Sequence, residues 1–236
     1  MQRFVTLLIA LMLSSLTDAT DLQPFYAEYR GEYQGLPVNA KGIRQLTQRD
    51  DGSYELTSSA SALFMNLEES TEFELINGQV VPRAYHYERK MLGKKKQEAV
   101  IFDWGSMTAS HEGTTSPLTN GTLDKLGYQL QLRLDVAQHL GTPDNQQTLS
   151  YLIADEEKRK DYTFSFIGEE TLSTPAGELK TIVVTRYRAD KDRRTTVWLA
   201  IDHHLLLVRL KQEEPDKGFE LNLERFEFPH EVAGDK

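Results

Sequence analysis

Along much of the chain, apolar and polar residues alternate with a period of two, which places every second side chain on one face of a β-strand. The pattern is clearest near the C-terminus, where it predicts strands over residues 195–201, 206–213 and 219–228. Polar turns over 202–204 and 215–218 separate these strands. Three consecutive antiparallel strands form a meander, the building unit of up-and-down sheets.

Turn signals punctuate the rest of the chain. Asn77-Gly78 is the strongest, because both residues tolerate the positive φ angles of a type I′ hairpin turn. Pro82 cannot donate a ladder hydrogen bond, so we expect it at a bulge or an edge. The lysines at 94–96 follow Gly93 between two strand patterns, which indicates a solvated hairpin tip. We therefore predict an all-β, mainly antiparallel fold, a large curved sheet or open barrel of roughly a dozen strands.

One segment has helical spacing instead, and residues 122–140 are predicted to form the one major helix. Thr122 is a candidate N-cap, Asp124 suits the positive end of the helix dipole, and Gly141 stops the helix. Two apolar stripes indicate that the helix is covered over a wide arc. We expect the sheet to wrap around it. The stripes consist of Leu123, Leu126, Leu130, Leu134 and Ala137, and of Leu132, Val136 and Leu140.

The N-terminus has the pattern of a secretory signal peptide over residues 1–19. Arg3 precedes an apolar run at 4–13, and small residues end at Ala19. The run is too short for a transmembrane helix, although an uncleaved anchor is the alternative. We expect cleavage after Ala19, a periplasmic location and a single β-rich domain over 20–236. The chain contains no cysteine, so we expect neither a disulfide nor attachment of lipid to a cysteine.

Charge and motifs argue against several classes of function. The formal net charge of −9, without a long basic tract, disfavours nucleic acid and charge-driven binding to an anionic membrane. None of the six histidines stands in a metal-binding pattern, and His203-His204 reads as a solvated turn. The chain has no glycine-rich phosphate loop and no GxSxG motif. We expect no enzyme, no catalytic residues, no cofactor and no metal.

Two resemblances bear on fold and compartment. The elements at 198–202, 208–209 and 216–218 resemble the end of bacterial periplasmic lipoprotein carrier and receptor proteins. The stretches at 126–133 and 170–179 are similar to an uncharacterised bacterial family, domain of unknown function 3108, and this similarity covers most of the chain after residue 24. The matching motifs are structural. The resemblances therefore imply a fold and an exported protein, and no activity.

A cavity between sheet and helix is the candidate binding site. Leu126, Leu130 and Leu134 from the helix, with Trp104 and Trp198 from the strands, are the predicted ligand-binding residues. An ordinary core would use the same residue types, and we also expect Trp198 to be buried. Two hypotheses remain: a carrier for an amphiphile such as a lipid or an acylated protein, and an envelope interaction or scaffold protein whose core is filled.

Overall fold

The computed structural model describes residues 22–33, 36–141, 147–155 and 158–229. The predicted signal peptide at 1–19 lies outside these residues. Most of the described chain forms strands that join in one sheet, so the predicted all-β class is confirmed at this level. Among these residues, no helix has the length and apolar character needed to cross a membrane.

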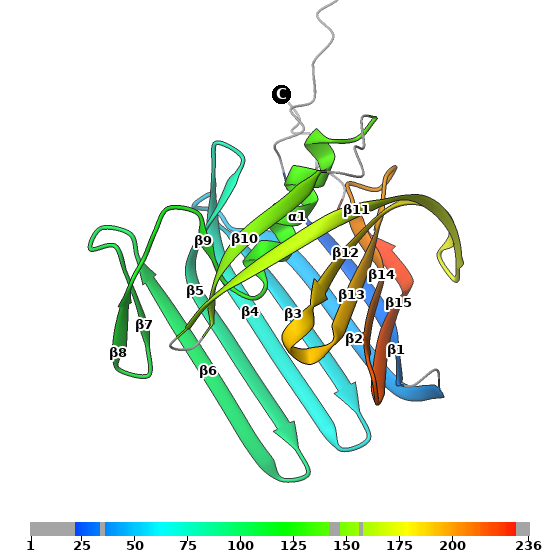
Figure 1. The fold of residues 1–236 in the computed structure, drawn as a ribbon, viewed down its shortest axis with the longest axis horizontal. Coiled ribbons are helices and arrows are strands. Elements are labelled where there is room, and N and C mark those ends of the chain that lie inside the picture. The colour runs from blue at the N-terminus through cyan, green and yellow to red at the C-terminus, as the bar shows by residue number, and fades with distance from the viewer. Residues whose placement is uncertain (1–21, 34–35, 142–146, 156–157, 230–236) are drawn as a thin grey trace, which may run out of the picture.

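The sheet is a single curved layer of fifteen strands within the described residues (Figure 1), more than the dozen expected. Strand β1 (Phe25–Tyr33) pairs with β2 (Leu36–Gln48) on one side and with β15 (Lys217–Glu227) on the other. On one side of β1 the strands run in order from β2 to the edge strand β8. On the other side they run in reverse order from β15 to the edge strand β9. The pairings are antiparallel except that of β9 with β10. The sheet is therefore an open barrel-like meander.

The remaining elements complete the sheet and its connections. They are β3 (Tyr54–Ala62), β4 (Met65–Ile76), β5 (Gln79–Met91), β6 (Lys94–Asp103), β7 (Thr108–His111), β8 (Thr114–Pro117), β9 (Thr122–Leu123), helix α1 (Gly127–Gln138), β10 (Thr148–Asp155), β11 (Lys158–Thr174), β12 (Gly177–Arg188), the 3₁₀ turn η1 (Ala189–Lys191), β13 (Arg193–Ala200) and β14 (Leu206–Glu214).

The turn chemistry explains the hairpins as expected. Asn77 and Gly78 have φ angles of 51° and 75°, so the predicted β4–β5 turn is confirmed. Pro82 lies opposite Phe73, where the register shifts, so the predicted bulge is confirmed too. The lysines at 94–96 are exposed at the start of β6. The C-terminal meander is present as β13, β14 and β15.

Helix α1 is shorter than the predicted 122–140 at both ends. Thr122 and Leu123 form β9 and pair in parallel with β10. The cap is Asp124, not Thr122: its Oδ1 accepts hydrogen bonds from the N–H groups of Leu126 (2.8 Å) and Gly127 (2.7 Å). Thr122 instead donates to the Thr119 carbonyl (2.8 Å). The buried Asp124 carboxylate thus satisfies two backbone N–H groups at the helix start. Thr122 does not, because it belongs to β9.

Helix α1 lies within the curve of the sheet and packs against β5 and β10 (Figure 1). Both predicted stripes face the core. Leu126, Leu130, Leu132, Leu134 and Val136 are buried there, while Leu140 beyond the helix end is exposed. The helix therefore lies on the concave side of the curved sheet.

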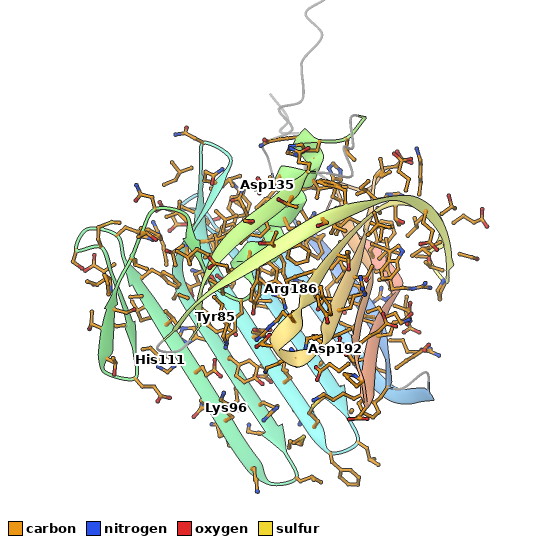
Figure 2. The ribbon with its side chains drawn as sticks, viewed as in Figure 1. Tyr85, Lys96, His111, Asp135, Arg186 and Asp192 are labelled. Carbon is orange, nitrogen blue, oxygen red and sulfur yellow. The ribbon has the colours of Figure 1, made fainter. Side chains whose placement is uncertain are left out.

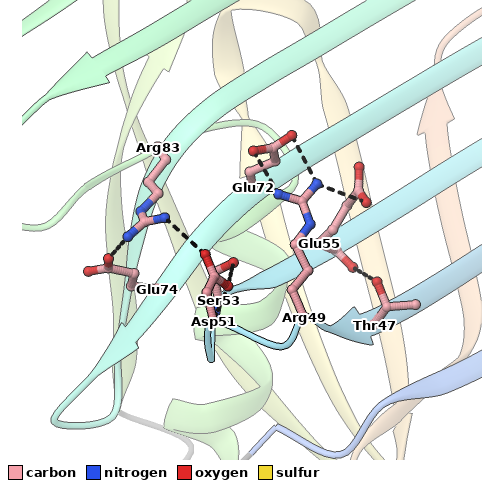
Figure 3. Close-up of polar contacts among 8 residues, drawn as sticks. All are labelled: Thr47, Arg49, Asp51, Ser53, Glu55, Glu72, Glu74 and Arg83. Carbon is pink, nitrogen blue, oxygen red and sulfur yellow. Dashed lines mark hydrogen bonds and ion pairs between the residues drawn. The ribbon is translucent and has the colours of Figure 1, made fainter.

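Ion pairs on the other face of the sheet join neighbouring hairpins (Figure 3). Arg49 pairs with Glu72 (3.0 Å) and Glu55 (3.2 Å), and Arg83 pairs with Glu74. These side chains are partly or largely exposed to solvent. Exposed pairs of this kind contribute about 0–1 kcal/mol each, so they organise the surface more than they stabilise the fold.

Candidate functional site

The contact between α1 and the sheet encloses a small apolar cavity of about 30 Å³. One water molecule needs roughly this much space, whereas pockets for drug-sized ligands span about 300–1,000 Å³. Helix α1 thus leaves little free space at this contact with the sheet. The cavity is lined by Phe25, Tyr29, Arg44, Tyr128, Gln129, Leu130, Leu132, Arg133, Val197, Leu199, Leu207 and Leu210.

Two arginines border this cavity. The Arg133 guanidinium donates to the His204 carbonyl (2.8 Å) and lies 5.0 Å from the centre of the Phe25 ring. Its burial lowers the pKa of Arg133 to about 10. Arg44 donates to Gln129 Oε1 (2.8 Å). The other wall residues are aliphatic or aromatic except Gln129, so the two arginines are the charged groups at this cavity.

A buried polar cluster lies at the start of the helix. Thr71 donates to Asp124 Oδ2 (2.6 Å), and the Tyr85 hydroxyl donates to Glu69 Oε1. Desolvation raises the pKa of Asp124, although its hydrogen bonds act in the opposite direction. Desolvation likewise raises the pKa of Glu69. The Thr71–Asp124 bond attaches the start of the helix to β4, and the Tyr85–Glu69 bond joins β5 to β4.

An ion triplet lies beside this cluster. Glu98 on β6 is buried and accepts from Lys125 (2.6 Å) and Lys96 (2.5 Å). Burial acts to raise the pKa of Glu98, but the two lysines outweigh it and lower the value to about 2. The triplet joins the turn before α1 to the middle of β6.

Arg186 is a buried cation with incomplete hydrogen bonding. Its side chain projects from β12 and lies 3.6 Å from the Tyr162 ring centre, and the residue is 7% exposed. Its Nε and Nη1 atoms have no hydrogen-bond partner within the described part of the chain. Figure 2 shows Arg186 and Tyr85 near the middle of the molecule. The Tyr162 ring meets Tyr128 of α1 edge to face (5.1 Å), so Arg186 is held by aromatic contacts.

The predicted ligand-binding leucines lie where the sequence placed them. Leu126, Leu130 and Leu134 are all buried, and Leu130 lines the small cavity. That these three leucines bind a ligand remains a prediction.

Neither tryptophan lines the cavity. Trp104 is half-buried, donates to the Pro82 carbonyl (2.7 Å) and stacks near Phe102. Trp198 is also half-buried, so its predicted burial is wrong. It alternates with Val197 and Leu199, which line the cavity, and therefore points to the opposite face. There its Nε1 donates to Glu170 (2.7 Å), and Arg209 lies over its ring.

Sequence reasoning missed two buried arginines, Arg133 and Arg186, and the half-buried Arg44. Arg44, Arg133 and Arg186 interrupt apolar patterns, and charged residues at such positions read as surface residues. One signal was available for Arg133, since it stands between Leu132 and Leu134 in a helix that is apolar over a wide arc.

A larger hollow of about 750 Å³ lies on the sheet face away from α1. Its walls include Glu55, Glu68, His86 and Glu88, and the Glu88 carboxylate is bound by Lys90 and Lys95. The described residues contain no group of three His, Cys, Asp or Glu side chains able to hold a metal ion. The hollow is thus an open surface lined largely by polar side chains.

Comparisons with known proteins bear on family and fold. The sequence model of a family described as "Protein of unknown function (DUF3108)" matches residues 28–224. A comparison with curated protein sequences finds no match.

Several solved structures are similar in shape. A β-barrel-like protein of domain of unknown function DUF1849 from Brucella abortus has a TM-score of 0.59 at 9% identity, over 89% of this chain and 99% of that one. A presumed lipoprotein from Parabacteroides distasonis has a TM-score of 0.37 at 12% identity, over 87% and 96%. MucB in complex with MucA(peri) has a TM-score of 0.33 at 12% identity, over 93% and 55%. Only the first likeness bears on the fold, which is barrel-like.

Proposed function

We propose that this chain, which belongs to the DUF3108 family of proteins of unknown function, is an exported, non-enzymatic protein of the cell envelope that acts through its surface. The filled interior is the observation that carries the proposal. The cavity at the contact between α1 and the sheet has a volume of only about 30 Å³, and Leu130 in its wall is 1% exposed. A lipid chain would need roughly ten times that volume or more, which the packed helix denies it.

The exported location rests on the signal pattern at residues 1–19. Expression in a bacterium that exports proteins, followed by N-terminal sequencing of the mature form, tests this part. A mature protein that begins at Thr20 supports it, whereas one that begins at Met1 or within residues 2–10 contradicts it.

A second candidate is a carrier for an amphiphile, either a lipid or an acylated protein. It is favoured by one specific observation, the apolar cavity with Arg44 and Arg133 at its border. An acidic headgroup could pair with these cations while its chain replaced α1 against the sheet. Gly121 and Gly141 flank the helix segment with φ angles of 79° and 85°, which gives both connections a backbone able to adjust.

Mass spectrometry of gently extracted protein separates the two candidates. The filled-core proposal expects no lipid in stoichiometric amount, and the carrier expects a co-purifying amphiphile. Leu130→Ala then distinguishes them further. With a filled core it lowers stability by about 2–5 kcal/mol without recruiting lipid. Leu140→Ala, on an exposed residue, is the matched control. A wild-type protein that carries lipid and loses it in Leu130→Glu would overturn the filled-core proposal.

A further inference from the structure

Two hairpin turns lie side by side at the end of the sheet remote from the helix (Figure 1). Leu63 and Phe64 form the β3–β4 turn, and Leu92 and Gly93 form the β5–β6 turn. The Leu92 N–H donates to the Phe64 carbonyl (3.1 Å), which joins them. We call residues 61–67 and 89–96 together the paired tip. The helix is hydrogen-bonded to the opposite end of β5, where the Gln131 side chain accepts from the Val80 N–H and donates to the Gly78 carbonyl.

The paired tip exposes large apolar side chains. Leu63 is 84% exposed, Leu92 72%, Phe64 65% and Met91 40%. Turn residues in soluble proteins are usually polar or glycine. Four exposed apolar side chains thus gather at the ends of two neighbouring hairpins, and such a gathering is typical of an interaction site.

Turn geometry does not explain the leucine. Leu92 has a φ angle of 49° and Gly93 one of 77°. The β4–β5 turn adopts nearly the same angles with Asn77 and Gly78. Asparagine is favoured in this left-handed conformation, whereas a leucine there costs stability. The same chain thus uses the favoured residue at one end of β5 and a strained, exposed leucine at the other. Turn stability therefore gives no reason for a leucine at position 92.

Basic residues surround the apolar extremity. The paired tip contains five, namely Arg89, Lys90, Lys94, Lys95 and Lys96, and no acidic residue. Lys90, Lys95 and Lys96 are each about half exposed or more and reach back to Glu88 or Glu98. The excess of positive charge is local. The whole chain has a formal net charge of −9, which disfavours charge-driven binding to an anionic membrane elsewhere on its surface, and the paired tip is the exception.

We propose that the paired tip binds the surface of an anionic lipid bilayer. The apolar side chains occupy the very end of the hairpins and the lysines lie just behind them on β5 and β6. This order matches the depth profile of a bilayer, in which the acyl boundary lies beneath anionic headgroups. Charge complementarity selects an acidic surface, and the two narrow turns suit insertion better than a flat protein interface. The inference rests on the proposed function, because it names the surface on which the protein acts.

Vesicle sedimentation with the purified mature protein tests the inference. We expect binding to phosphatidylcholine vesicles that contain phosphatidylglycerol, weak binding to phosphatidylcholine alone, and loss of binding in high salt. Leu92→Asn should lower the partition coefficient about tenfold, because one inserted leucine is lost. Its melting temperature should stay unchanged or rise, because asparagine suits the turn. Ile76→Thr, an exposed apolar residue at the opposite end of β4, is the control.

The charge component has its own test. Lys94→Gln with Lys95→Gln should lower the partition coefficient roughly fivefold for each lysine removed. Lys211→Gln with Lys217→Gln, on the β14–β15 hairpin, should leave it unchanged. Equal binding to neutral and acidic vesicles, no binding at all, or binding that survives both tip variants would overturn the inference. Absence of vesicle binding together with absence of co-purifying lipid would leave the filled-core proposal standing and direct the search to a protein partner.

Discussion

Thr71 Oγ1 donates a 2.6 Å hydrogen bond to Asp124 Oδ2, and both residues are fully buried. Strand β4 is thereby attached to the residue that caps α1. The second carboxylate oxygen of Asp124 accepts from the first turn of the helix. One side chain thus starts the helix and also positions it against the sheet.

Asp124→Asn should change how stability depends on pH. Desolvation raises the folded-state pKa of Asp124 above 3.8, so its favourable contribution is complete below 3.8 and is lost as the pH rises through the raised value. Asparagine retains the cap without ionising. The free energy of unfolding of Asp124→Asn relative to wild type should therefore increase as the pH rises from about 3.8 through the raised pKa of Asp124. Urea unfolding across this range measures it. Asp202→Asn, an exposed change, is the control, and a pH-independent difference would contradict the prediction.

Glu98→Gln should show the opposite dependence. The lysines hold the folded-state pKa at about 2, below the ordinary 4.5, so the stabilisation is present above 4.5 and is lost as the pH falls towards 2. We expect a loss of about 2 kcal/mol at pH 7 that vanishes in acid. Urea unfolding of Glu98→Gln and wild type at pH 7 and in acid, near the pKa of about 2, measures the difference. Glu213→Gln, in the exposed pair with Lys211, should cost less than about 1 kcal/mol.

Gln131→Leu should destabilise the protein although it adds apolar surface to a buried helix. Gln131 accepts from the Val80 N–H (2.8 Å) and donates to the Gly78 carbonyl (3.2 Å). Leucine would leave both backbone groups buried without partners, at a cost of about 1–3 kcal/mol. Thermal unfolding measures the change, with Gln138→Leu as the exposed control on the same helix. A more stable Gln131→Leu protein would show that water can replace the amide.

Trp198→Ala should cost only about 1–2 kcal/mol, because the half-buried indole leaves no closed cavity. Phe73→Ala, which removes a fully buried ring, should cost about 3–5 kcal/mol. Thermal melts of the two variants, compared with wild type, give the ranking. Equal losses would place Trp198 in the core after all.

Local chemistry explains the parts of the fold that were predicted correctly. Asn77-Gly78 and Pro82 act through backbone preferences that hold in any context, so their turn and bulge follow from residue type. The apolar stripes of α1 likewise dictate a helix that must be covered. The helix start was misplaced because Thr122 and Asp124 are both good caps, and only pairing of β9 with β10 selects between them.

The sequence by itself determined the strand periodicity, the meander, the single covered helix and the family. Tertiary structure alone decided that α1 leaves only a small cavity, that Trp198 faces away from it, and that the turn at 63–64 lies beside the turn at 92–93. The physical reason is that periodicity specifies which residues share a face, whereas cavity volume depends on how strands distant in sequence curve around that face. Twist, register shifts and hairpin neighbours arise from summed contacts across the whole sheet, and no local pattern encodes them.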